Sequence, residues 1–370
     1  LATAYVSRPM SGPGISLVFI VLAGIAAMLF FGQSTNSFVV VVAAMSGIVG
    51  GEIVLLGLIA LPQMFRLGYD RKLSIGTIAA SGSLATLIPP SVVLIVYGSE
   101  AGVSVKDLFS AGFLPGLLLA SLYVTYIVVR TRLNPALGPA YDAPEAQLPF
   151  MGRLRYMTGL IVPFLLIGGV LGSIYAGIAT VTESAALGAA GSVLVAALRK
   201  ELSIHGIREA LWATTVTTGS IVWLIVGAVS LVGIYNLMGG TSFLRNLLTG
   251  MDVAPIVVIL TMMAIILVLG TFMDWIAIVF ITVPVFAPVV TSLGYDPVWF
   301  GILFAMNIQI YMLSPPFGPA CFYLKSVAPP DVTLQEIFAA VLPFIGLQLI
   351  GLTLVVMFPQ IALWLPAALK

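Results

Sequence analysis

Two pairs of adjacent prolines, Pro89-Pro90 and Pro315-Pro316, stand inside long apolar stretches of the chain. Proline has no backbone N–H and clashes with the preceding helical turn, so two in a row break a helix. A break at membrane depth frees carbonyls that can bind Na⁺ and exposes helix N-termini that favour anions. The simpler interpretation is that each pair only kinks a packed helix. Two pairs, placed symmetrically in two halves of the chain, favour ion-coupled transport.

Three acidic residues, Glu52, Glu183 and Asp274, lie in apolar stretches, where ionisable side chains are costly and commonly functional. Glu52 and Asp274 hold comparable places near two glycine-rich breaks. We expect Asp274 either to orient the neighbouring backbone N–H groups or to face an ion. Glu183 follows Thr180, and this pattern favours a helix-start role over a ligand role. The single histidine, His205, lies in a charged loop.

The composition decides the class of protein. The 370 residues are 60% hydrophobic and 8% charged, with a net charge of +1, whereas a soluble domain carries roughly 25% charged residues. Too few charges remain to cover a water-exposed surface, to keep a chain disordered or to attract a nucleic acid. One cysteine excludes a disulfide framework and a Cys-ligated metal site. The sequence therefore predicts an all-α polytopic protein in a lipid bilayer, with roughly ten membrane elements.

Apolar runs between charges give the expected membrane segments. They cover residues 15–31, 38–65, 74–97, 108–129, 157–175, 183–198, 211–237, 255–290, 298–323 and 337–365. The runs at 38–65 and 255–290 are long and interrupted, so we expect two re-entrant helical hairpins that enter from opposite faces. Basic residues near 66–72, 130–155 and 199–208 place those loops on the cytoplasmic side.

The two halves of the chain resemble each other. Gly68-Tyr69-Asp70 matches Gly294-Tyr295-Asp296, and the two Pro-Pro pairs follow at the same spacing. Each half reads as a hairpin, a Gly-Tyr-Asp loop, a Pro-Pro-broken helix and a further helix. Inverted repeats with broken helices are typical of secondary transporters. Fewer helices precede the first hairpin than the second, so we expect a segment to be missing near residues 37–39.

These motifs resemble the DctM-like large membrane subunit of tripartite ATP-independent periplasmic (TRAP) transporters. The resemblance is carried by residues 46–50, 57–62, 68–70, 79–84, 88–91, 114–117, 177–186, 270–274 and 315–318. Two departures stand out. Val181 occupies a position where the family usually has proline, and the family has more sequence between the first helix and the first hairpin.

The resemblance implies Na⁺-driven import of a small organic anion, a carboxylate, across the bacterial inner membrane by an elevator mechanism. Na⁺ is the implied coupling ion, with no other cofactor and no enzymatic activity. The implied partners are a DctQ-like small membrane subunit and a DctP-like periplasmic substrate-binding protein. The expected division is an N-terminal scaffold segment at 1–37, transport repeats at 38–107 and 255–331, and scaffold helices at 108–254 and 332–370.

Two Na⁺ sites are expected, each between a hairpin tip and a helix break. Glycines let carbonyls approach an ion there, and hydroxyls add the oxygen ligands that a hard cation prefers. The first site comprises Ser46, Gly47, Gly50, Ser81, Pro89 and Ser91. The second comprises Gly270, Thr271, Met273, Asp274, Ser314, Pro315 and Gly318. For each small polar residue the alternative role is packing between helices.

The substrate path is expected to include Ser83, Asn307, Gln309 and Lys325. The two amides either contact substrate or bond between helices, and Lys325 either attracts the anion or reaches the cytoplasmic face. Three other functions compete with the tripartite transporter: a stand-alone divalent-anion/Na⁺ symporter, a channel and an intramembrane enzyme. An enzyme would need an acid–base or nucleophile set, which the carboxylates and the one histidine do not supply.

Overall fold

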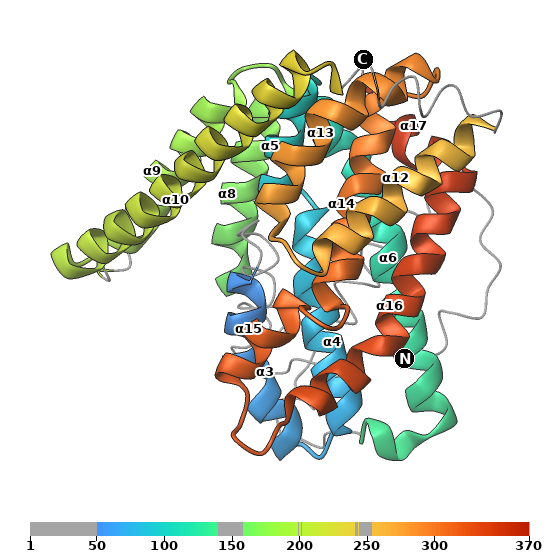
Figure 1. The fold of residues 1–370 in the computed structure, drawn as a ribbon. Helices are drawn as coiled ribbons and strands as arrows, with labels where there is room; N and C mark the ends of the chain where they lie inside the picture. The colour runs from blue at the N-terminus through green and yellow to red at the C-terminus, as the bar shows by residue number, and fades with distance from the viewer. Residues whose placement is uncertain are drawn as a thin grey trace.

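Figure 1 shows the computed structural model, which describes residues 50–139, 158–198, 200, 202–240, 243 and 254–369. All regular elements of these residues are helices. By length and composition, five of the described helices could cross a membrane: α6, α9, α10, α13 and α16. The polytopic all-α prediction is thus confirmed in its coarse form. The predictions for residues 1–49, among them the first helix, the missing segment, Ser46 and Gly47, lie outside the described residues.

A first series of helices begins at the first hairpin. It comprises α3 (Gly51–Arg66), α4 (Arg71–Ser83), a short 3₁₀ turn η1 (Leu84–Thr86), α5 (Val92–Ala101) and α6 (Val105–Leu133), followed by η2 (Pro135–Leu137). Gly68 takes a φ of +79° after α3, where a side chain would be strained. Asp70 then accepts a hydrogen bond from the Leu73 N–H and starts α4. The Pro89-Pro90 pair lies between η1 and α5, so the predicted break is present.

A second series contains four helices that follow one another as α3, α4, α5 and α6 do, with one more helix before them and one after them. It comprises α12 (Pro255–Gly270), α13 (Trp275–Ser292), α14 (Pro297–Leu313), α15 (Pro319–Val327), α16 (Leu334–Met357) and α17 (Gln360–Ala368). Gly294 takes a φ of +82° after α13, and Asp296 accepts from the Val298 N–H to start α14. The loop chemistry of the first series is therefore repeated, and Pro315-Pro316 breaks the second helix as Pro89-Pro90 breaks the first.

The two series pack together into one body (Figure 1). Helix α3 contacts α15, and its counterpart α13 contacts α5; likewise α4 contacts α16, and α14 contacts α6. Contacts between the series thus occur in exchanged pairs. Helix α14 is the central element, because every side chain from Trp299 to Leu313 is buried.

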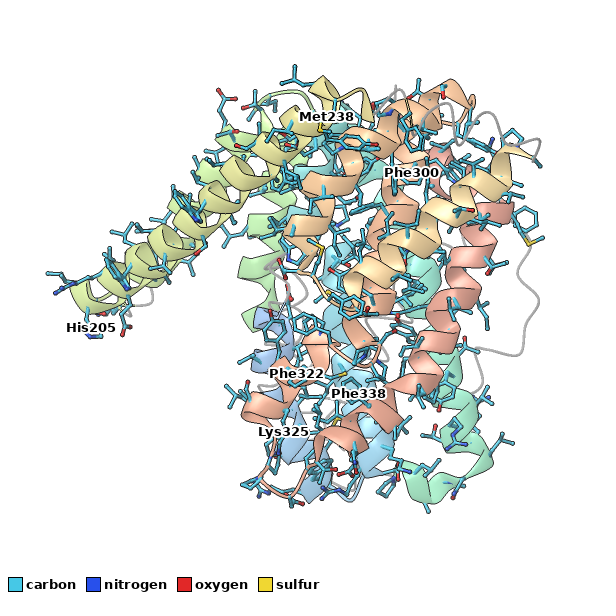
Figure 2. All side chains as sticks on the ribbon, viewed as in Figure 1. His205, Met238, Phe300, Phe322, Lys325 and Phe338 are labelled. Carbon is cyan, nitrogen blue, oxygen red and sulfur yellow. The ribbon has the colours of Figure 1, made fainter. Side chains whose placement is uncertain are left out.

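Three further helices form a layer at one side of the body: α8 (Thr158–Tyr175), α9 (Val181–Leu198) and α10 (Ile204–Leu237). Thr180 and Glu183 exchange hydrogen bonds at the start of α9, which confirms the predicted helix-start role of Glu183. Lys106 donates to the Tyr175 carbonyl and so joins α6 to the end of α8. Helices α9 and α10 form an arm that ends at the exposed His205 (Figure 2) and carries many exposed apolar side chains.

Two differences from the predicted segments are larger than a shift of a few residues. The single last segment at 337–365 is divided into α16 and α17. Pro359 has no N–H to continue the helical ladder, so α16 ends before it. Helix α10 begins at Ile204 instead of at residue 211, because Ser203 accepts a hydrogen bond from the Gly206 N–H and caps the charged first turns.

Candidate ion and substrate sites

The first helix break is held by a chain of hydroxyl–carbonyl hydrogen bonds. Thr86 Oγ1 donates to the Ser83 carbonyl over 2.9 Å, and Ser91 Oγ donates to the Thr86 carbonyl. Ser91 also accepts from the Leu94 N–H at the start of α5. All three hydroxyl side chains are buried. The break is therefore an ordered, oxygen-rich turn inside the protein.

Gly50 and the start of α3, the described end of the predicted first tip, lie beside this break. Gly50 has a φ of +101°, and a Cβ there would come within 2.8 Å of the Tyr323 ring on α15. One turn later, Ile53 packs so closely on α4 that a Cβ on Gly82 would lie 2.3 Å from its Cγ1. Gly82 follows Ser81 directly. The structure thus brings Gly50, on the tip, and Ser81, before the break, into one region, together with the fully buried Glu52.

The second hairpin tip turns between α12 and α13. Asp274 accepts a hydrogen bond from the Ile276 N–H over 3.2 Å, so this carboxylate orients the start of α13 as one of the two predicted roles requires. A Cβ on Gly270 would lie 2.3 Å from the Tyr311 ring of α14. Asp274 is also within electrostatic reach of the Tyr311 and Tyr323 hydroxyls.

The second break follows Tyr311 by three residues. Ser314 Oγ donates to the Ile310 carbonyl over 2.7 Å, and Gly318, with a φ of +37°, starts α15. Pro315 and Pro316 are exposed, in contrast to the buried Pro89 of the first break. The residues predicted for the second site therefore lie at or near the surface of the body, with Thr271 and Met273 half-buried on the tip.

The ligand chemistry of both regions suits a hard cation. No group of three or more His, Cys, Asp or Glu side chains that could hold a metal occurs in the described part of the chain. What the tips and breaks present are hydroxyls, carbonyls and two carboxylates, Glu52 and Asp274. These are the oxygen donors that hard ions prefer, whereas transition metals prefer nitrogen and sulfur ligands.

The four residues expected along the substrate path lie in two different places. Ser83, Asn307 and Gln309 are at most 2% exposed between the helices, and Asn307 Nδ2 donates to the Met263 carbonyl over 2.6 Å. Lys325 lies at the lower end of the body in Figure 2, where Nζ donates to the Val332 carbonyl over 2.6 Å. Ser83 and Asn307 make their hydrogen bonds with the protein itself.

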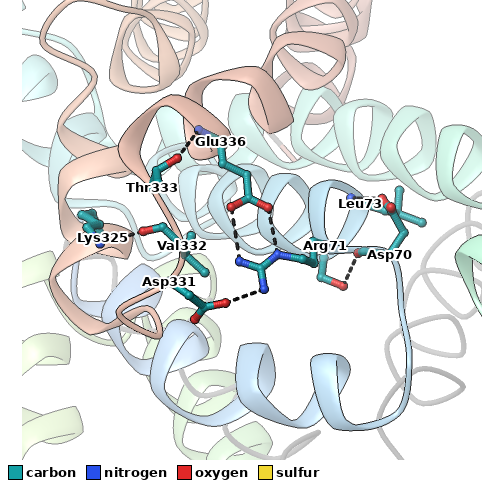
Figure 3. Close-up of polar contacts among 9 residues, drawn as sticks. Asp70, Arg71, Leu73, Lys325, Asp331, Val332, Thr333 and Glu336 are labelled. Atoms are coloured by element: carbon teal, nitrogen blue, oxygen red, sulfur yellow. Dashed lines mark hydrogen bonds and ion pairs between the residues drawn. The ribbon is translucent and has the colours of Figure 1, made fainter.

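An ion-pair network joins the two series at this lower end (Figure 3). Arg71, at the start of α4, lies 2.6 Å from Asp331 and 2.9 Å from Glu336. Glu336 stands in the first turn of α16, and its N–H donates to the cap residue Thr333. The hydrogen bond from Arg71 holds the pKa of the Asp331 carboxyl below its ordinary value. Because Arg71 is 41% exposed, its pairs are partly screened by solvent.

Sequence comparison identifies the family to which these elements belong. The family model described as "Tripartite ATP-independent periplasmic transporter, DctM component" matches residues 17–361. This chain belongs to that family. Its relatives are transporter permeases and not enzymes, and large permeases of this kind work with a small permease and a periplasmic binding protein in tripartite systems.

Several relatives of this DctM-family chain have a substrate in their names. The C4-dicarboxylate large permease of Pseudomonas aeruginosa is 30% identical over 88% of this chain and 74% of its own length. The sialic acid large permease SiaM of Vibrio cholerae is 30% identical over 84% of this chain and 71% of its own. The isethionate permease DctMQ of Oleidesulfovibrio alaskensis is 29% identical over 87% of this chain, which spans 50% of that longer protein.

Sequence reasoning missed four polar side chains that the fold places near the breaks: Tyr123 on α6, Tyr311 on α14, Tyr323 on α15 and Gln348 on α16. Tyr123, Tyr311 and Gln348 are buried. Tyr311 and Tyr323 flank the Pro-Pro pair of the second break, and this position is a signal that the sequence does contain. Gln348 is an amide within an apolar helix, and polar residues in such helices commonly bond to neighbouring helices.

Proposed function

We propose that this protein imports a small organic anion, coupled to Na⁺, across the bacterial inner membrane as the transport subunit of a tripartite system. A DctQ-like small subunit and a DctP-like binding protein would be its partners. The named substrates of the relatives, a C4-dicarboxylate, sialic acid and isethionate, are all organic acids, and they support this substrate class.

The main structural support for the proposal is that both hairpin tips pack against the second broken helix. The first tip lies against Tyr323 of the second broken helix, and the second tip lies against Tyr311 of the same helix. Asp274 follows the second tip and caps the start of α13. Ions bound at tip and break would fix both hairpins, and the substrate carboxylate would then meet the bound Na⁺ and the N-termini of α5 and α15.

The paired contacts between the two series support an inverted repeat and an elevator mechanism. In this proposal the body moves against the layer of α8, α9 and α10. Helices α6 and α16 pack on the broken helices α14 and α4, so we assign them to the moving body and not, as the sequence alone suggested, to the scaffold. The apolar arm of α9 and α10 would remain fixed in the lipid.

Uptake into proteoliposomes tests the coupling. The purified protein, with its two partner proteins, is expected to accumulate labelled organic acid only under an inward Na⁺ gradient; equal uptake without the gradient would refute the proposal. A matched pair of variants tests the second site. Thr271→Val is expected to raise the Na⁺ concentration for half-maximal uptake, whereas Thr261→Val, on the exposed face of α12, is expected to leave it unchanged.

The stand-alone symporter is distinguished by omitting the binding protein. A tripartite transporter is expected to show no uptake without that protein, and uptake that persists in its absence would favour the symporter.

A further inference from the structure

A buried amide on α16 contacts the residue that leads into the first break. Gln348 Nε2 donates to Ser83 Oγ over 3.1 Å, although the two residues are 265 positions apart in the chain. Both side chains are at most 1% exposed. A hydrogen bond between neutral groups is strengthened in such surroundings, and without it Ser83 Oγ keeps only its donation to the Ala80 carbonyl over 2.8 Å. Gln348 therefore constrains Ser83 from outside the broken helix.

The contact continues through the break by successive hydrogen bonds. The Ser83 carbonyl accepts from Thr86, the Thr86 carbonyl accepts from Ser91, and Ser91 caps α5. Each of these hydrogen bonds fixes the backbone position of the next residue in the series. These residues offer oxygen atoms to the first candidate ion site. A change in the position of Ser83 is thus transmitted to Ser91, which is itself a candidate ligand.

Two more buried polar side chains lie at this level. The Tyr123 hydroxyl of α6 neighbours Gln348 and Ser83, yet neither it nor Gln348 Oε1 has a hydrogen-bond partner of good geometry among the described residues. Gln309 of α14 likewise has both amide atoms unpaired within the part of the chain that is described. The unpaired donors are the Tyr123 hydroxyl and the Gln309 amide nitrogen. The unpaired acceptors are the amide oxygens of Gln309 and Gln348, so this level of the protein contains both kinds of group.

The register of α14 against α16 places Gln309 level with Gln348. Trp299 Nε1 donates to the Val355 carbonyl over 3.0 Å, and further along, Met306 lies 3.5 Å from a Cβ built on Gly351. The two helices therefore run antiparallel, and the next turn along sets Gln309 opposite Gln348. Gln309 lies five residues, or about one and a half turns, before Ser314 on the same helix, so α14 connects this level to the second break.

We propose that Gln348 is a positioning residue for the first ion site, and that Gln309 brings the second broken helix into the same buried network. The inference rests on the proposed Na⁺-coupled function. In this arrangement Ser83 and Gln309 serve the internal network and do not contact substrate. When one break moves, α16 transmits the movement to the other break. Ion binding at one site is thereby coupled to ion binding at the other.

Gln348→Met tests the proposal, because methionine keeps the volume of glutamine and cannot donate a hydrogen bond. The variant is expected to raise the half-saturating Na⁺ concentration about two- to ten-fold, the range given by loss of one ordinary hydrogen bond. At saturating Na⁺ the rate and the KM for substrate are expected to return to wild-type values, which a general folding defect would not allow. Thr353→Val is the control, since Thr353 lies exposed on the same helix.

Ser83→Ala removes the acceptor while leaving α16 intact, and provides the measurement if Gln348→Met does not fold. Gln309→Met is expected to raise the half-saturating Na⁺ concentration as well. The double variant, Gln348→Met with Gln309→Met, is expected to show a smaller change in the free energy of Na⁺ binding than the sum of the two single changes. An unchanged Na⁺ dependence in Gln348→Met and Ser83→Ala would overturn the inference while wild-type coupling stands. Loss of Na⁺ dependence in the wild type itself would instead overturn the proposed function, and the inference with it.

Discussion

Gly112 on α6 packs directly against the first helix break. A Cβ on Gly112 would lie 2.6 Å from the backbone oxygen of Leu87, where ordinary contacts begin at 3.4 Å. Gly112→Ala therefore requires the break or α6 to move by about 0.8 Å. The obstacle is a backbone carbonyl, so no side-chain rotation can relieve it. The expected effects are a less stable protein and a displaced first ion site.

The magnitude follows from two opposing terms. Overpacking of a tight interior costs roughly 1–3 kcal/mol, and replacing a helical glycine by alanine returns up to about 1 kcal/mol. Gly346→Ala on α16 isolates the second term, because a Cβ there meets nothing within 4 Å. We expect Gly112→Ala to be less stable than Gly346→Ala by about 1–3 kcal/mol, or about 1–4 °C in Tm for a chain of this length.

Thermal unfolding of both variants in detergent measures the difference, and Na⁺-dependent uptake measures the effect on the site. Gly112→Ala is expected to require more Na⁺ for half-maximal uptake, whereas Gly346→Ala is expected to behave as the wild type. Equal Tm values for the two variants, together with an unchanged Na⁺ dependence, would refute the reasoning that the first break is fixed by this contact.

Two further predictions concern stability. Asn307→Leu removes the buried hydrogen bond from Nδ2 to the Met263 carbonyl and is expected to destabilise the protein by about 0.5–1.5 kcal/mol; wild-type stability by thermal unfolding would contradict that role. Arg71→Met is expected to cost less than about 1 kcal/mol and to matter least in high salt; Arg66→Met, which removes an arginine from the end of the preceding helix, is its control. Since the Asp331 pKa is lowered, protonation removes this pair only as the pH falls through that lowered value, below the ordinary value of about 3.9, and an Arg71 contribution that vanished near pH 6 would argue against the pairing.

Features that depend on neighbouring residues were determined by the sequence. Both Gly-Tyr-Asp loops pair a glycine of positive φ with an aspartate cap, and Glu183 caps the start of α9 with Thr180. The Pro-Pro pairs break their helices because proline has no N–H to donate. In each case the physical cause lies within a few residues, so the residue types alone are sufficient.

Tertiary structure decided which distant side chains meet. Nothing local to Gln348 points to Ser83, which is 265 residues away, nor does Asn307 by itself reveal that it bonds to the Met263 carbonyl. The close approach of Gly112 to Leu87 likewise depends on how α6 crosses the break. These contacts arise from helix packing, in which register and crossing geometry select one partner among many apolar surfaces of similar composition. The sequence therefore determined where the helices break, and the packing determined what holds each break in place.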